Sequence, residues 1–193
     1  MINVRQRAVK QDEDSYLIDK VLHGEKHFYN QIIEKHKAYA FTIALNVLGN
    51  REDAEEVAHD SFIKAYKALG KFNKEAKFST WLYRIVFNTA VSIKRKNKIY
   101  TEELDYASGV YSDDQSSNME NMDKKKFINA ALLNLPELDR TILTLFYLRD
   151  HSLEEIADII QMNFNNVKVR LHRARKKMAV EMQTILKGEA LNL

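Results

Sequence analysis

A run of basic charge lies near the C-terminal end, where six basic residues fall within ten positions: Lys168, Arg170, Arg173, Arg175, Lys176 and Lys177. No acidic residue lies among them, so their like charges repel one another. Phosphates would neutralise these side chains and release counterions, which makes such binding weaken as salt rises. Asn165 and Asn166 lie just before this run, and amide side chains can hydrogen-bond base edges. The pattern predicts contact with duplex DNA; the alternative is an exposed basic helix without a partner.

Two short helices must hold that basic run in place, and the stretch from Ser152 to Met178 supplies both. Ser152 and Glu155 form a capping box, which specifies a first helix of about nine residues. A turn at Gln161 and Met162 leads to Asn163, a good cap for a second helix. We predict a helix-turn-helix whose second helix enters the major groove. The residues expected nearest the duplex are Asn165, Asn166, Lys168, Arg170, His172, Arg173, Arg175 and Lys176.

A second group of residues suits single-stranded DNA and lies on a helix expected over residues 79–96. Aromatic side chains alternate there with cations, and the segment leads into the basic run KRKNK. Bases can stack on aromatic rings while cations neutralise the backbone. Trp81 also suits the protein core, because an indole buries a large area. The residues expected to contact melted DNA are Tyr83, Arg84, Phe87, Asn88, Lys94 and Arg95.

A third group is acidic and lies on a helix expected over residues 51–69. Asp53, Glu56 and Asp60 recur at helical spacing and share one exposed face. A solvated surface would explain them; the functional interpretation is docking onto a basic protein surface, where complementary charge adds rate and selectivity.

The composition predicts an all-α fold for the elements that carry these groups. The chain has 193 residues with one proline, five glycines and 45% hydrophobic residues, which favours helices. Helices are expected to end at Gly24, Gly49 and Gly70, with a left-handed cap at Gly70. The net charge of +3 does not argue for a nucleic-acid partner, and the absence of cysteine excludes disulfides and thiolate metal sites.

The order of charge and periodicity predicts two small helical domains joined by a flexible acidic linker. Residues 99–122 hold many acids among Ser and Asn, and Thr101 to Asp123 contains no Lys or Arg. We expect a disordered N-terminus over 1–11, a first domain over 12–98, the linker over 99–122, a second domain over 123–187 and a tail over 188–193. No signal peptide or membrane span is apparent, so a cytoplasmic location is expected.

The two domains together resemble the extracytoplasmic-function sigma factors of the sigma-70 class. LGNREDAEEVAHDSFIKAY and FSTWLYRIVFNTAVSIKRK resemble the first domain of that family. LPELDRTILTLFYLRDHSLEEIADIIQMNFNNVKVRLHRARKKM resembles the second. The resemblance implies a subunit that directs RNA polymerase to promoters, without catalysis or a cofactor. His59, Ser92, Gln161 and Val169 depart from residues that the family often has.

The resemblance also implies partners. The helix with Asp53, Glu56 and Asp60 would bind the clamp of the largest polymerase subunit, and the polymerase flap would be a further contact. The loop at residues 72–77 and the helix with Tyr83, Arg84, Phe87 and Asn88 would capture bases of the melted minus-ten element, while the second domain would contact the minus-thirty-five duplex. The linker would run toward the active-site and RNA-exit channels, and an anti-sigma factor would hold the protein inactive.

Two other functions fit parts of the sequence. A helix-turn-helix regulator would bind duplex DNA by itself and use its first domain to dimerise or to sense a ligand. An enzyme could use the histidines, but His23, His27, His36, His59, His151 and His172 form no HExxH pattern or carboxylate-rich metal spacing. We therefore expect no enzymatic activity, no metal and no cofactor.

Overall fold

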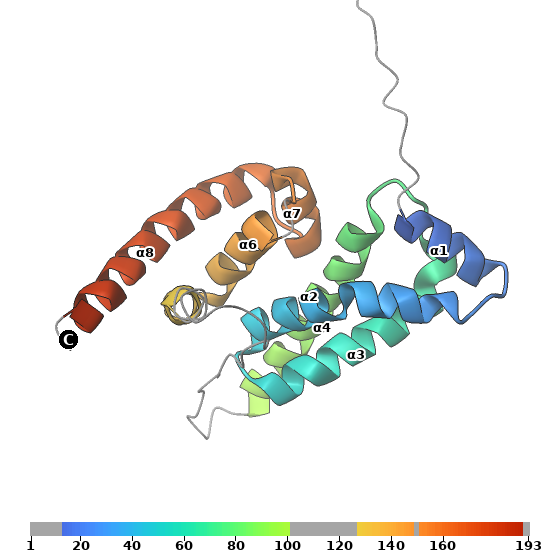
Figure 1. The fold of residues 1–193 in the computed structure, drawn as a ribbon, viewed down its shortest axis with the longest axis horizontal. Coiled ribbons are helices and arrows are strands. Elements are labelled where there is room, and N and C mark those ends of the chain that lie inside the picture. The colour runs from blue at the N-terminus through green and yellow to red at the C-terminus, as the bar shows by residue number, and fades with distance from the viewer. Residues whose placement is uncertain (1–12, 101–126, 149–150, 191–193) are drawn as a thin grey trace, which may run out of the picture.

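The computed structural model describes residues 13–100, 127–148 and 151–190, and these form helices joined by short connections (Figure 1). The N-terminal body contains α1 (Glu13–Leu22), α2 (Phe28–Leu48), α3 (Arg51–Ala68) and α4 (Phe78–Tyr100). The C-terminal body contains a helical segment at 127–133 followed by α6 (Glu137–Leu148), α7 (Leu153–Ile160) and α8 (Phe164–Ala190). The described residues contain no strand, and the predicted all-α class is confirmed.

The N-terminal body is a bundle in which α2, α3 and α4 pack against one another and α1 lies against α2. Its core includes Ile32, Ile43, Val57 and Leu82, whose side chains are shielded from solvent. Asn50 caps α3 by accepting a hydrogen bond from the Asp53 backbone N–H at 2.8 Å. These contacts fix the acidic face of α3 on the side away from the core.

The two glycine turns differ from one another. Gly49 ends α2 with a φ of 83°, in the left-handed region that suits glycine. The left-handed cap predicted at Gly70 is wrong, because Gly70 lies inside a short 3-10 turn (Leu69–Lys71) that continues from α3 with right-handed geometry. The chain is therefore turned toward α4 by a tightened last helical turn.

The C-terminal body has the predicted helix-turn-helix. Both hydrogen bonds of the capping box between Ser152 and Glu155 are present. Gln161 takes a left-handed φ of 52°, and the Asn163 side chain then accepts a hydrogen bond from the Asn165 backbone N–H at 2.9 Å. The short turn sets α8 across α7, while α8 also packs along α6.

The expected boundaries differ slightly from the elements. α4 extends to Tyr100, two residues into the expected linker, and α8 extends to Ala190, beyond the expected end of the second domain. The rest of the expected linker, the N-terminus over 1–11 and the last residues of the tail lie outside the described residues.

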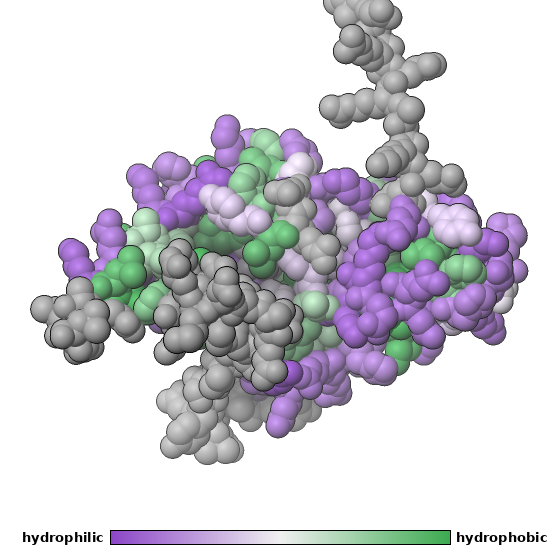
Figure 2. Space-filling model, in the orientation of Figure 1, coloured by the Kyte–Doolittle hydropathy of each residue, from purple (hydrophilic) through white to green (hydrophobic). Residues whose placement is uncertain are grey.

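The two bodies contact each other through α4 against α7 and α2 against α6. Polar side chains cover most of the N-terminal body on the face in Figure 2, whereas apolar residues gather along α6 and α8. A groove of about 640 Å³ lies there, lined mainly by Ile128, Leu132, Leu143, Tyr147, Leu148 and Met178. Among the described helices, none is long and apolar enough to cross a membrane.

Candidate nucleic-acid interface

The outward face of α8 carries most of the residues predicted to contact duplex DNA. Val167, Leu171 and Ala174 are buried against the rest of the C-terminal body, which turns the opposite side of the helix to solvent. The exposed side chains on this side include Asn165, Asn166, Lys168, His172, Arg173 and Lys176. This arrangement leaves a largely polar and basic surface on a short helix-turn-helix.

Arg170 lies on the flank of α8 and is held by the protein itself. Its Nε donates a hydrogen bond to Asp139 Oδ1 at 2.7 Å, and Lys177 Nζ donates to Asp139 Oδ2 at 3.0 Å. Asp139 is almost completely buried, so two cations compensate one shielded carboxylate. The pair joins α6 to α8 and fixes the orientation of the helix. Sequence patterns did not single out Asp139, because its partners lie more than 30 positions away.

Arg175 is turned toward α6, although it was predicted to lie near the duplex. Its guanidinium lies 4.8 Å from the ring centroid of Phe146 and 5.4 Å from that of Tyr147. A cation over aromatic faces is attracted by their electron density. In this arrangement Arg175 stabilises the packing of α8 on α6 and borders the apolar groove.

Tyr83 and Phe87 of α4, predicted to contact melted DNA, are not presented to solvent in this arrangement. Tyr83 is 1% exposed and Phe87 is 8% exposed. The Tyr83 ring lies 4.8 Å from the Tyr39 ring and 5.7 Å from that of His151, which belongs to the C-terminal body. The second body therefore helps to cover a part of α4 that was expected to be open.

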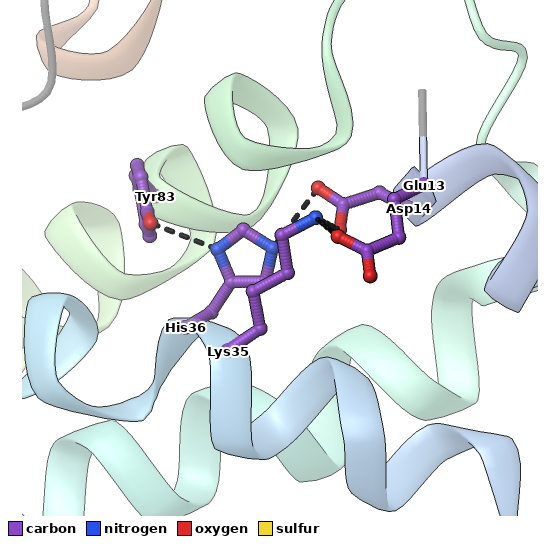
Figure 3. A network of polar contacts seen from close by, with 5 residues as sticks. All are labelled: Glu13, Asp14, Lys35, His36 and Tyr83. Carbon is purple, nitrogen blue, oxygen red and sulfur yellow. Dashed lines mark hydrogen bonds and ion pairs between the residues drawn. The ribbon is translucent and has the colours of Figure 1, made fainter. Parts of the chain in front are cut away.

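A buried polar network fixes Tyr83 from the other side (Figure 3). His36 Nε2 lies 3.0 Å from Asp14 Oδ2, and His36 Nδ1 lies 2.9 Å from the Tyr83 hydroxyl. Because a carboxylate only accepts, Nε2 donates its proton to Asp14, while Nδ1 lies at hydrogen-bond distance from the Tyr83 hydroxyl. The network joins α1, α2 and α4.

Asp14 stays charged in this buried place because Lys35 and His36 hydrogen-bond its carboxylate. Burial alone would raise the pKa of its carboxyl, but hydrogen bonds and charge from His36 and Lys35 outweigh burial and hold the pKa below its usual value. Lys35 Nζ lies 2.7 Å from Asp14 Oδ1 and also donates to the exposed Glu13 carboxylate. The network was not foreseen, since it depends on residues from three helices.

Arg84 lies at the contact between the two bodies. Its Nε donates a hydrogen bond to the backbone oxygen of Asp158 at 2.9 Å, and its Nη2 lies 3.4 Å from Asp158 Oδ2. Lys94 donates to the backbone oxygen of Val47 at 2.9 Å and forms an ion pair with Glu137. Asn88 and Arg95 are exposed. Of the residues predicted to bind melted DNA, only Asn88 and Arg95 are exposed here.

Further hydrogen bonds cross the contact between α2 and α6. The Tyr39 hydroxyl donates to the backbone oxygen of Thr144 at 3.0 Å, and the Asn46 amide donates to Thr144 Oγ1 at 3.0 Å. Arg140 Nη2 donates to the backbone oxygen of Asn46 at 3.0 Å. Arg140 Nε is buried and has no hydrogen-bond partner within the described residues. The contact is specific and polar, but a buried donor without a partner weakens it.

The predicted acidic face of α3 is present, but part of it is hydrogen-bonded within the protein or half-buried. Glu56 is exposed, whereas Asp53 accepts a hydrogen bond from the Asn50 amide at 2.7 Å and thereby supports the helix cap. Asp60 is half-buried. Ile63 and Tyr66, next to this face, are 40% and 38% exposed. The surface of α3 thus combines acidic and apolar residues, which is typical of a protein-binding site.

Two family descriptions match the chain in the order of its two bodies. The family described as Sigma-70 region 2 matches residues 32–99, and the family described as Sigma-70, region 4 matches residues 128–178. The first match covers α2 to α4, and the second covers most of the helix-turn-helix body.

Curated relatives match along nearly the whole chain. The ECF RNA polymerase sigma factor SigW of Bacillus subtilis is 30% identical, over 87% of this chain and 96% of that protein. The RNA polymerase sigma-H factor of Pseudomonas aeruginosa is also 30% identical, over 92% of this chain and 97% of that protein.

Two solved structures share the fold. The sigma factor RpoE in complex with the anti-sigma factor NepR from Bartonella quintana gives a TM-score of 0.67 at 21% identity, covering 80% of this chain and 96% of that one. CnrH in complex with the cytosolic domain of CnrY gives 0.63 at 20% identity, covering 88% and 96%.

The Asp14 network predicts a pH-dependent contribution to stability. Because the folded pKa of Asp14 is lowered, its charged form stabilises the fold above the ordinary value of 3.8, and this contribution is lost as pH falls through the lower folded pKa. Asp14→Asn should therefore unfold at lower urea concentration than the unmodified protein at neutral pH, with the difference shrinking below about pH 4. Glu13→Gln, which changes an exposed neighbour, is the control; a difference for Asp14→Asn that does not vary between pH 3 and 7 would contradict the assignment.

Proposed function

The chain belongs to the ECF sigma factors of the sigma-70 family, and from this premise we propose how its two helical bodies share promoter recognition. It is an RNA polymerase sigma factor, which directs the polymerase to the promoter at transcription initiation. The observation that carries the division of labour is the exposed basic face of α8 in one body, together with a helix α4 rich in aromatic and cationic residues in the other. The alternative of a helix-turn-helix regulator that is not a polymerase subunit is not favoured, because the region 2 match accounts for the first body.

In the proposed mechanism α8 fixes the protein on the minus-thirty-five duplex. Lys168, Arg173 and Lys176 neutralise phosphates, and Asn165 and Asn166 at the start of the helix address base edges. His172 lies on the same face. Arg170 supports this surface from its flank while bound to Asp139, and Arg175 supports it through its contact with α6.

We assign the melted minus-ten element to α4. Asn88 and Arg95 are open to it already, whereas Arg84 must leave Asp158 and Tyr83 must lose the cover of His151 before either contacts a base. Unstacked bases would then stack on aromatic rings, while cationic side chains neutralise the phosphates of the backbone. Phe87 and Lys94 belong to the same assignment.

The closed arrangement cannot hold both promoter elements at once. Arg84 contacts Asp158, which precedes Asn165 by seven residues, so the two reading surfaces lie within about 25 Å along the chain. The two elements, about 25 base pairs apart by their names, are separated by roughly 85 Å of duplex. The chain between Tyr100 and Phe127 spans up to about 95 Å when extended. We therefore propose that the bodies separate when the polymerase and promoter are bound.

Two surfaces suit the polymerase. Asp53, Glu56 and Asp60 on α3 are assigned to the clamp of the largest subunit, where opposite charges steer association. The apolar groove between α6 and α8 is assigned to the flap, because exposed apolar grooves mark protein-binding sites. Binding at both surfaces would supply the free energy that opens the contact between the two bodies.

Regulation and location follow from the same premise. RpoE and CnrH are seen with the anti-sigma factor NepR and with the cytosolic domain of CnrY, and we propose that an anti-sigma factor likewise holds this protein inactive. The protein is proposed to act in the cytoplasm, with no membrane insertion, catalytic activity, metal or cofactor of its own. Initiation requires only binding and conformational energy from these surfaces.

Run-off transcription tests the function directly. Purified protein is added to sigma-free core polymerase on a library of genomic promoter fragments, and transcripts are sequenced. We expect discrete start sites that share two upstream elements and disappear without the added protein. Shifted duplex DNA without polymerase, together with no specific transcript, would instead support the regulator.

Charge reversal on α3 should weaken docking on the polymerase. Asp53→Lys together with Glu56→Lys places positive charge toward a basic surface, and binding to core polymerase should weaken roughly tenfold or more. Glu56→Lys alone leaves the Asn50–Asp53 contact intact and should show a smaller effect in the same direction. Glu75→Lys, an exposed acid outside α3, is the matched control. Undiminished core binding by both α3 variants would count against the assignment.

Separate loss of the two DNA contacts should follow from two alanine variants. Arg173→Ala should weaken binding of holoenzyme to the upstream duplex about tenfold and reduce the dependence on salt, while leaving fork DNA without the upstream element unaffected. Asn88→Ala should impair binding to fork DNA with a single-stranded minus-ten element. The control for Arg173→Ala is Lys187→Ala, which removes another exposed positive charge of α8. The control for Asn88→Ala is Asn30→Ala, which changes another exposed asparagine. Equal loss by Arg173→Ala on both templates would contradict its placement.

A further inference from the structure

Val169 is an apolar side chain in the middle of the polar outward face of α8. It is 50% exposed. One helical turn before it lie Asn165 and Asn166, and one turn after it lie His172 and Arg173, all of them exposed. Single exposed valines are common on protein surfaces, so exposure alone decides nothing. The position of Val169 is informative, because a helix that enters the major groove with these neighbours also brings Val169 against the base pairs.

The surroundings of Val169 are fixed by the buried carboxylate of Asp139. Val169, Asn166 and Arg173 border a hollow of about 450 Å³, which Arg170 and Lys177 of the same helix also line. Both of these cations are held by Asp139 at hydrogen-bond distance. Arg173 has no hydrogen bond or ion pair to the part of the protein that the structure describes, so it is free to reach a phosphate or base. Val169 is thus an apolar side chain among cations, two of which, Arg170 and Lys177, are held in place by Asp139.

The major groove offers one apolar group that matches such a point, the C5 methyl of thymine. We propose that Val169 selects thymine at one position of the upstream duplex by packing its side chain against that methyl. The inference rests on the proposed duplex-binding role of α8 and adds to it a residue that determines sequence preference. Cytosine lacks the methyl, and a base without it leaves Val169 facing a solvated or polar edge.

The test removes the methyl alone. Holoenzyme made from the full chain and core polymerase first selects its upstream element from a duplex library randomised at that element. The selected duplex is then remade with deoxyuridine in place of each thymine of the element in turn. Uracil pairs as thymine does and lacks only the C5 methyl. At one position the substitution should weaken binding of the unmodified protein about fourfold, as expected for loss of one buried methyl.

Val169→Ser should bind the thymine and uracil duplexes within about 1.5-fold of each other at that position, since the apolar partner is gone. Serine and valine have similar helix propensities, and the site is exposed, so α8 should stay folded. Val180→Ser changes the same residue type on the same helix at 59% exposure, outside the basic run, and should keep the fourfold preference.

The outcomes separate this proposal from the function on which it rests. Equal binding of thymine and uracil duplexes by the unmodified protein, or an undiminished preference in Val169→Ser, would overturn the role of Val169 while Arg173→Ala still weakened the upstream contact. If no upstream sequence is selected and Arg173→Ala has no effect, then the assignment of α8 to the duplex fails, and the proposal fails with it.

Discussion

The contact between α4 and α7 is the constraint on which the behaviour of the molecule depends. Through it, Arg84 of the first body hydrogen-bonds the backbone of Asp158 in the second, and His151 covers the ring of Tyr83. The same residues are needed for melted DNA in the proposed mechanism. In that mechanism one set of side chains serves two mutually exclusive partners, the second body and the promoter, and any factor that binds one arrangement better would shift the population toward it.

The two reading surfaces are not affected equally by this contact. The outward face of α8 stays open while the bodies are together, whereas only Asn88 and Arg95 are exposed among the six α4 residues assigned to melted DNA. In the proposed mechanism a closed protein would still meet duplex DNA by charge but would not trap unpaired bases. Arg140 Nε is buried without a hydrogen-bond partner among the described residues, and such a donor weakens the contact between the bodies.

Local features were predictable from the sequence, and long-range polar contacts were not. The capping box at Ser152 and Glu155, the turn at Gln161 and the cap at Asn163 depend on neighbours along the chain, so spacing was enough to find them. The left-handed cap predicted at Gly70 was wrong because a glycine after a helix also fits a tightened 3-10 turn. Tyr83 resembled an exposed aromatic because its partners Asp14, His36 and His151 lie far away in sequence. The paired acid Asp139 was missed for the same reason.

The distance between the two bodies tests the central claim most directly. The sequence contains no cysteine, so Glu75→Cys and Glu154→Cys introduce two unique labelling sites near the Lys77–Glu155 ion pair that joins the bodies. Spin labels at these sites allow the distance to be measured in the free protein and in a transcribing complex with core polymerase and promoter DNA. We expect a short distance in the free protein and an increase of tens of ångströms in the complex. An unchanged short distance in a complex that initiates transcription would contradict the account.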